Sequence, residues 1–405
     1  MKTMDTGSPQ RVANATVLAG LVLACAASVS GPTPQAMAET PQEAPVIGAL
    51  LPMSGSPSSQ EYARMFLDGV EVAVDLARRA GVNVQLVVED NGGTPSGSVR
   101  GVSALVDRGA VAILGPLAAG NVSAASEAAP RRLPFFSPTA RDLPDGQRGV
   151  YSMGAGNPAA GLVLADAATG LGYFDAVVVH PRSPGETLEA TAFAEAFRAV
   201  GGAVRRRIEY LPGTTTFEVP LLEAKSLAPR LLVVAAAPSD IELLAPQIAF
   251  FGLDTIGVQV AGTAGWTGTA VMEGVARRHT DGVISVSPLA PDAVEDLPTD
   301  FVEAYERRFR RSLHSMVPAT GFDLFRMALA AYGAGRRTSG DLVAALERLH
   351  RFAGVTGSYS FADGRLTREY FPVRIYGGSL HPVDTEFPEA GQPGPAGPRP
   401  HFGTR

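Results

Sequence analysis

Residues 46–88 read VIGALLPMSGSPSSQEYARMFLDGVEVAVDLARRAGVNVQLVV, and their pattern indicates the fold class. Its first six residues, 46–51, are apolar and predict a buried strand. Residues 62–80 carry apolar side chains at helical spacing, and Gly81 ends the predicted helix. Residues 82–88 predict a second strand. The order strand, helix, strand predicts a βαβ unit and therefore a parallel sheet.

The same alternation continues toward the carboxyl terminus. Further strands are expected at 111–114, 133–136 and 150–153, with helices at 96–107 and 121–129 between them. This order predicts a doubly wound parallel sheet, in which functional loops follow the carboxyl ends of the strands. The loops concerned are 52–60, 115–120 and 137–142.

A second run of alternation begins after residues 154–158, a Gly- and Pro-containing segment expected to cross between lobes. It predicts strands at 176–179, 204–210, 231–235, 258–261 and 283–286, with helices at 186–200 and 239–250. After a linker at 288–298, helices are expected at 299–310, 320–332 and 340–350. Asp363-Gly364 predicts a hairpin between strands 358–361 and 371–376.

The predicted fold is therefore α/β, with two doubly wound parallel-sheet lobes joined by a hinge with several crossings. The first lobe is expected to comprise 46–153 and 287–335. The second is expected to comprise 154–286 and 336–383. Residues 1–45 are expected to be a signal peptide and linker, and the Pro- and Gly-rich residues 384–405 a disordered tail.

Composition excludes several classes of protein. Of the 405 residues 45% are hydrophobic and 18% are charged, which is typical of a globular chain. A formal charge of -6 gives no basic surface for a nucleic acid. The sequence contains no G-x-S-x-G, P-loop or H-E-x-x-H motif, and its six His residues are scattered. We therefore expect no enzyme activity, no bound metal and no cofactor.

The amino-terminal residues predict export. Lys2 and Arg11 precede an apolar run at 17–29, too short to span a membrane. Two processing routes stay open. Cleavage after Ala38 releases the protein into the periplasm, whereas Cys25, in the sequence LVLAC at 21–25, is typical of a bacterial lipoprotein. A lipid on Cys25 would then be the only contact with the membrane, at the cell envelope.

Several segments together resemble a known family, the type 1 periplasmic binding proteins of the leucine-binding, branched-chain amino acid kind. The matching segments are IGALLPMSG at 47–55, DGVE at 68–71, ILGP at 113–116, FSPT at 136–139, FVEAY at 301–305, GFD at 321–323 and GSYSFADG at 357–364. The resemblance implies a non-enzymatic extracytoplasmic solute-binding protein. Such a protein captures a small ligand, either amino acid-like or an anion such as a carboxylate, between two lobes and passes it to the permease of an ABC importer.

The family's ligand loops imply where the site lies. The residues that the resemblance places there are Ser54, Tyr62, Ala119, Gly120, Thr139, Ala140, Arg141 and Trp266. In amino-acid-binding members a Ser and a Thr hold the ligand carboxylate and an acid in the second lobe pairs with its ammonium. Here Ala119 or Gly120 replaces the Ser and Arg141 the Thr, while the second-lobe loop 261–266 has no acid. We therefore expect Arg141 to favour an ammonium-free anion, unless it points into solvent beside Asp142.

Trp266 has two interpretations, a stacking platform for the ligand or a packed aromatic near the hinge. The whole chain also has an alternative function. DNGGTPSG at 90–97 and LGPLAA at 114–119 resemble penicillin-binding protein activators. A protein of that kind would be an envelope lipoprotein regulator that docks on a cell-wall synthase.

Overall fold

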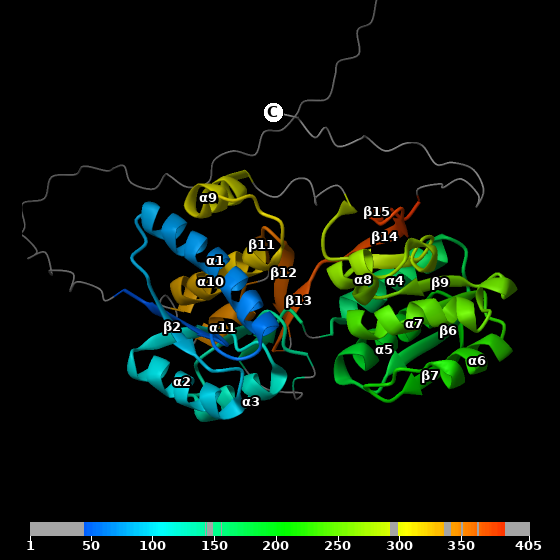
Figure 1. Ribbon diagram of the computed structural model, residues 1–405, viewed down its shortest axis with the longest axis horizontal. Helices are drawn as coiled ribbons and strands as arrows, with labels where there is room; N and C mark the ends of the chain where they lie inside the picture. Colours follow the sequence, from blue (N-terminus) through cyan, green and yellow to red (C-terminus); the bar gives the residue numbers. More distant parts are fainter. Residues whose placement is uncertain are drawn as a thin grey trace, which may run out of the picture. The chain divides into compact units, whose positions relative to one another are not determined.

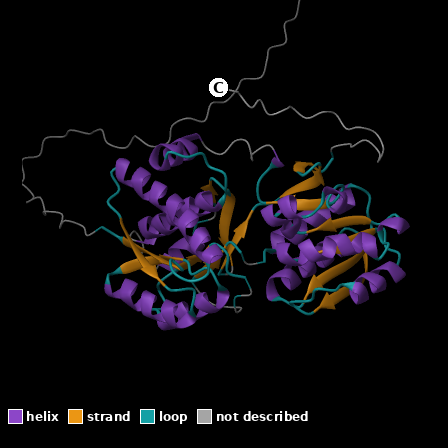
Figure 2. Cartoon of the chain, in the orientation of Figure 1, coloured by secondary structure: helices purple, strands orange, loops and turns teal. Residues whose placement is uncertain are grey.

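The computed structural model describes residues 44–141, 143, 149–154, 156–291, 299–335, 342–349, 351–362 and 364–384. Within them the strands form two mainly parallel sheets and one small antiparallel sheet (Figures 1 and 2). The predicted signal peptide, Cys25, Ala38 and the predicted tail from 385 onward lie outside the described residues. In the part of the chain described, no helix is both long enough and apolar enough to cross a membrane.

The first sheet has the strand order β2-β1-β3-β4-β5, with all neighbouring strands parallel. Its strands are β1 (Val46–Leu51), β2 (Gln85–Asp90), β3 (Ala110–Leu114), β4 (Phe135–Ser137) and β5 (Val150–Ser152). Side chains alternate between two cores, since Ala49 and Leu51 belong to one and Leu50 to the other. Helices α1 (Pro57–Arg79) and α10 (Val317–Gly335) cover the first face. Helices α2 (Pro95–Asp107) and α3 (Ala119–Ala128) cover the second (Figure 1).

The second sheet has the order β15-β14-β10-β9-β8-β6-β7. Its parallel strands are β6 (Asp175–Pro181), β7 (Ala203–Tyr210), β8 (Leu231–Val234), β9 (Gln259–Gly262) and β10 (Ile284–Ser287). Strand β14 (Phe371–Tyr376) adds antiparallel to β10, and β15 (Ser379–Pro382) adds antiparallel to β14. Helices α4 (Pro158–Gly170) and α5 (Pro184–Ala199) cover one face. Helices α6 (Glu218–Ser226) and α7 (Pro238–Phe250) cover the other.

Caps fix where the helices begin. The Ser56 hydroxyl accepts a hydrogen bond from the backbone N–H of Ser59 at 3.3 Å, and Pro57 opens α1. Proline fits the first turn of a helix because the N–H that it lacks would have no helical partner there. Helix α1 therefore starts five residues before residue 62, where the apolar pattern begins. Thr94 caps α2 in the same way, by accepting from Gly97 N at 3.1 Å.

The carboxyl-terminal region differs from the sequence prediction in two respects. The strand that follows Asp363-Gly364 and pairs with β12 (Gly357–Ala362) is β13 (Arg365–Arg368), not 371–376. The predicted partner strand is β14, which pairs with β10 and β15 instead. The core of the first sheet includes side chains of helix α11 (Leu342–Glu347) and of strands β12 and β13. Strand β11 (Phe352–Gly354) packs against this core. These residues were expected in the second lobe. Helix α9 (Thr299–Phe309) also contributes to the first core.

Candidate functional site

A cavity of about 200 Å³ is lined by residues that follow strands of both large sheets. The first sheet contributes residues from the ends of β4 and β5, and the second from the ends of β8, β9 and β10. Helix α5 and the segment between β13 and β14 complete the wall. The lining residues are Arg141, Met153, Gly154, Glu189, Ala236, Pro238, Ala264, Gly265, Thr267, Gly268, Pro288, Arg368 and Tyr370.

Hydrogen bonds fix the loop that carries Arg141. The Ser137 hydroxyl donates to the carbonyl oxygen of Pro116 at 2.6 Å and accepts from the backbone N–H of Ala140 at 3.0 Å. The Ser152 hydroxyl donates to Ala140 O, also at 2.6 Å. The loop after β4 is therefore tied both to the loop after β3 and to β5, and Arg141 leaves it at a defined position.

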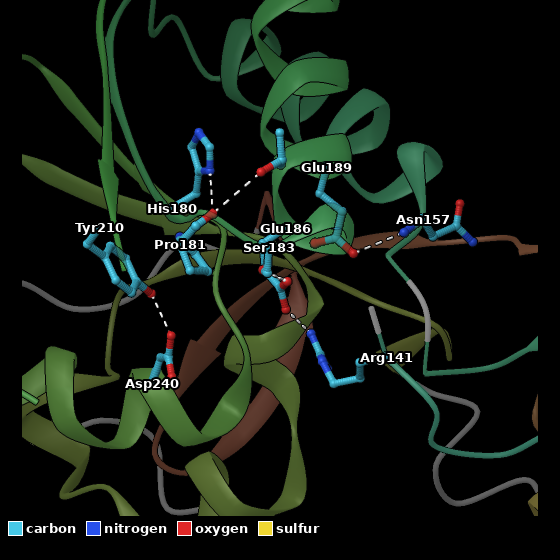
Figure 3. A network of polar contacts seen from close by, with 10 residues as sticks. Arg141, Asn157, His180, Pro181, Ser183, Glu186, Glu189, Tyr210 and Asp240 are labelled. Carbon is cyan, nitrogen blue, oxygen red and sulfur yellow. Dashed lines mark hydrogen bonds and ion pairs between the residues drawn. The ribbon is translucent and has the colours of Figure 1, made fainter. Parts of the chain in front are cut away.

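Arg141 forms an ion pair with Glu186 at the start of α5 (Figure 3). The Ser183 hydroxyl donates to the other oxygen of the same carboxylate. The side chain of Glu186 is only 4% exposed, whereas that of Arg141 is 41% exposed. Burial acts to raise the pKa of Glu186, but the positive charge of Arg141 and the Ser183 hydroxyl lower it overall. Glu186 is therefore ionised at neutral pH, and its charge neutralises that of Arg141.

Glu189 lies one helical turn after Glu186 and lines the cavity. One of its carboxylate oxygens accepts a hydrogen bond from the backbone N–H of Asn157 at 3.1 Å (Figure 3). Burial raises the pKa of Glu189 above its usual value, and the nearby charge of Glu186 acts in the same direction. Two acids on one helix thus have opposite pKa shifts.

Arg368, at the end of β13, presents a second guanidinium to the cavity. Its Nη2 donates to the hydroxyl of Tyr359 at 2.6 Å, and its Cζ lies 5.0 Å from the centre of the Tyr359 ring. Tyr370 lines the cavity two residues further on. Burial raises the pKa of Tyr370, so its phenol keeps its proton at neutral pH and is able to donate a hydrogen bond.

Of the eight residues that the sequence placed at the site, Arg141 alone lines this cavity. Ser54 is exposed and donates its hydroxyl to Asp90 at 2.5 Å, which closes the turn after β1. Tyr62 is half-buried in α1 and packs against the first core. Thr139 donates to Leu117 O at 2.9 Å. The other three small residues lie in the strand-end loops or at the start of α3: Ala119, Gly120 and Ala140.

Trp266 lies in the loop after β9 that lines the cavity, but its side chain points into the second core. The ring is fully buried, and its Nε1 donates to the carbonyl oxygen of Val234 at 3.3 Å. The indole therefore offers no exposed face for a ligand in the cavity to stack on. Packing is the interpretation that this position supports.

From the sequence, an acid of the second lobe was sought only in the loop 261–266, whereas the structure places acids on α5. The loop 261–266 has none, but on α5 Glu189 lines the cavity and Glu186 pairs with Arg141 beside it. Arg141 is half-buried and paired with Glu186, and Asp142 lies outside the described residues. The two glutamates stand three residues apart directly after the Ser183–Pro184 helix start. This spacing could have shown from the sequence that they share one face of the helix, but it was not used.

Sequence reasoning also missed Arg368 and Tyr370. Arg368 ends the late hairpin and Tyr370 follows it, far along the chain from the strand-end loops that the topology singles out. Within the part of the chain that the structure describes, no group of three or more His, Cys, Asp or Glu side chains is arranged to hold a metal ion.

Comparison with known proteins agrees with this architecture. Residues 45–379 match the family model described as Periplasmic binding protein. A structure of a branched-chain amino acid ABC transporter protein from Rhodospirillum rubrum is 24% identical, with a TM-score of 0.68, and covers 83% of this chain and 99% of its own. The substrate-binding protein LivJ from Streptococcus pneumoniae, in complex with isoleucine, is 23% identical with a TM-score of 0.60, and the match covers 84% and 98%.

A solute-binding protein of an ABC transporter from R. palustris, in complex with benzoate, is 19% identical with a TM-score of 0.60 and covers 84% of this chain and 95% of its own. A search of curated proteins gives no match. The family model spans most of the chain, including every strand of the two large sheets up to β14. This chain therefore belongs to the periplasmic binding protein family.

Proposed function

We propose that this chain is an extracytoplasmic solute-binding protein that captures a small ligand between two lobes and delivers it to the permease of an ABC importer. The observation that carries the proposal is the cavity, since strand-end loops of both large sheets line it together. Ligands of doubly wound sheets bind at the carboxyl ends of the strands. The two lobes of this proposal are 46–153 with 299–368, and 156–287 with 371–382.

The size of the cavity limits the ligand. Its volume of about 200 Å³ lies below the roughly 300–1,000 Å³ of pockets for drug-sized molecules. Isoleucine and benzoate, which two similar structures hold, are small enough to serve as starting compounds. The Arg141–Glu186 ion pair supports closure over such a ligand, because it joins a loop of the first sheet to a helix of the second.

The proposal is of a binding protein and not of an enzyme, because no nucleophile paired with a base lines the cavity among the described residues. The alternative, an envelope regulator that docks on a cell-wall synthase, rests on the sequence at 90–97 and 114–119. The importer is favoured because the similar structures include proteins of ABC transporters.

A thermal-shift screen followed by isothermal titration calorimetry tests this function. The panel contains isoleucine, leucine, benzoate, 3,4-dihydroxybenzoate, short peptides and dicarboxylates. We expect at least one compound to raise the melting temperature, because a ligand that binds only the folded state stabilises it. The same compound should titrate to one site per chain. If the protein binds no compound of the panel, the result favours the alternative function as an envelope regulator.

Export and anchoring are part of the proposal and rest on the sequence at 1–45. Labelling of cells with a radioactive fatty acid distinguishes the two processing routes. A label that disappears in Cys25→Ser supports the lipid anchor, whereas the absence of label together with a mature protein that starts after Ala38 supports release. Full-length protein that stays in the cytoplasm would contradict both routes.

A further inference from the structure

Three charged side chains line the cavity, namely Arg141, Glu189 and Arg368, and their charges are not equally available to a ligand. The charge of Arg141 is neutralised by Glu186. Glu189 is biased toward its neutral form, because burial raises its pKa. Arg368 is therefore the group that decides the net charge of the wall.

Arg368 is in ion-pair contact with no acid of the described residues. Its contacts are the hydroxyl of Tyr359 at 2.6 Å and the ring of the same residue, and no Asp or Glu among the described residues forms an ion pair with it. A guanidinium carries five N–H donors in a planar fork, so one hydrogen bond to a phenol leaves most of them unused. The charge of Asp323 acts on Arg368 without an ion pair between them. The unused donors of the guanidinium are therefore available to an anion that enters the cavity.

A buried chain of polar contacts holds Arg368 in place. Asp323 on α10 accepts hydrogen bonds from the backbone N–H groups of Val355 and Thr356, each at 2.8 Å. The Thr356 hydroxyl donates to Asp323 at 2.5 Å and contacts the hydroxyl of Tyr359. Tyr359 in turn accepts from Arg368. The guanidinium is therefore fixed at the cavity wall by a route that begins in the first core, and a fixed donor loses little entropy when a ligand binds.

We propose that Arg368 binds the carboxylate of the captured ligand, with the phenol of Tyr370 as a neutral donor beside it, and that the ligand class is small organic acids. This inference rests on the proposed capture of a ligand in the cavity and deepens it. It also moves the anion-recognising role that the sequence suggested for Arg141 to a residue of the β13 strand.

Calorimetric titration of the purified protein with two matched pairs of probes tests the inference. The pairs are benzoate with benzamide and leucine with leucinamide, in which the carboxylate is replaced by a neutral amide. We expect the acid of at least one pair to bind about tenfold or more tightly than its amide, because a charge-assisted hydrogen bond is stronger than a neutral one. This comparison uses the unmodified protein and does not depend on the folding of a variant.

Variants then assign the preference to one side chain. Arg368→Gln should weaken binding of the acid about ten- to a hundredfold and leave the amide nearly unchanged. Arg368→Lys keeps the charge and should restore part of the affinity. Arg365→Gln, which removes an exposed guanidinium from the same strand outside the cavity, is the matched control and should leave binding unchanged.

Equal binding of acid and amide by the unmodified protein, or full affinity for the acid in a folded Arg368→Gln variant, would overturn the inference while leaving ligand capture intact. If none of the four probes binds but another compound of the wider panel does, capture stands, and the small-acid inference fails when that compound binds no more tightly than its amide. If the wider panel gives no binder either, ligand capture fails with it.

Discussion

Glu186 and Glu189 stand three residues apart on α5, yet their surroundings shift their pKa values in opposite directions. Glu186 receives the guanidinium of Arg141 and the hydroxyl of Ser183, and this outweighs the cost of burial. Glu189 has a backbone N–H as its partner at 3.1 Å and no ion pair among the described residues, so burial prevails. A wall built in this way holds one permanent charge pair and one acid that is sensitive to pH.

Glu189→Gln gives a prediction about pH. A carboxyl group whose folded-state pKa is raised contributes stability that is fully present below its unfolded pKa, about 4.3, and is lost as the pH rises through the folded value. The glutamine keeps an acceptor for Asn157 N but never ionises. The unfolding free energy of Glu189→Gln relative to that of the wild type should therefore increase as the pH rises from about 4 to about 8. Urea unfolding at several pH values measures this, with exposed Glu195→Gln on the same helix as control. A difference that does not change with pH would contradict the assignment.

Asp323→Asn gives a prediction about stability. Asp323 is fully buried and accepts from two backbone N–H groups and one hydroxyl. An asparagine has one carbonyl oxygen in place of two carboxylate oxygens, so at least one buried donor loses its acceptor. Leaving such a donor unsatisfied costs about 1–3 kcal/mol, and we expect a loss of unfolding free energy in that range. Chemical denaturation measures it against Asp166→Asn, an exposed site on α4. Equal stability of both variants would contradict the role of Asp323 in the contacts that hold Arg368 in place.

At the scale of elements, the contact between α4 and α5 sets the position of Glu189. The two helices approach so closely that a Cβ on Gly161 would lie 2.3 Å from the carbonyl oxygen of Glu189 and 2.6 Å from the backbone nitrogen of Phe193. A residue other than glycine would force the helices apart. At Gly170, the last residue of α4, an added Cβ would meet no atom within 4 Å.

Gly161→Ala and Gly170→Ala form a matched pair that tests this packing. Overpacking a tight contact typically costs about 1–3 kcal/mol, so Gly161→Ala should lower the unfolding free energy by that amount. The same change at Gly170 should leave it equal or slightly higher, because alanine favours the helix. Thermal and urea unfolding measure both. Two variants of equal stability would show that the helices tolerate a wider separation than the structure has.

The elements also show what sequence patterns can predict. Apolar runs such as 46–51 and 231–235 placed the buried strands, because strands covered on both faces are continuously apolar. The Asp363-Gly364 pair was recognised as lying between two strands, but the second strand was misplaced. Strand β13 has only four residues, three of them polar. The following strand β14 is more apolar, and it was therefore predicted as the second strand of the hairpin. The pairing of β14 with β10 is a long-range contact, and no local pattern indicates it.

For the whole molecule, the sequence predicted that loops after the strands form the site, but not which side chains point into it. The position of Arg141 at the site could be predicted, because it lies in a loop after a strand of the first parallel sheet. Those of Arg368 and Tyr370 could not, because these residues come from the far end of the chain and reach the cavity only through the packing of the hairpin on the first core. Trp266 shows the converse, since its loop lines the cavity while its ring is buried in the second core.

The single Trp of the chain makes its position measurable. Because Trp266 is fully buried and donates to Val234 O, its fluorescence should be blue-shifted and resistant to quenching by acrylamide. We expect this with and without ligand, since the ring is already shielded in the second core. Strong quenching in the free protein that ligand removes would instead place the indole at the cleft.

A small ligand is expected to bind where loops of both sheets meet. Hydrogen–deuterium exchange with mass spectrometry, with and without the tightest compound of the panel, tests it most directly. We expect slower exchange in three segments that are far apart in the sequence but share one cavity, namely the loop at 139–141, the loop at 263–268 and residues 368–370. Protection confined to one of the two sheets, or exchange that stays unchanged in all three segments, would contradict it.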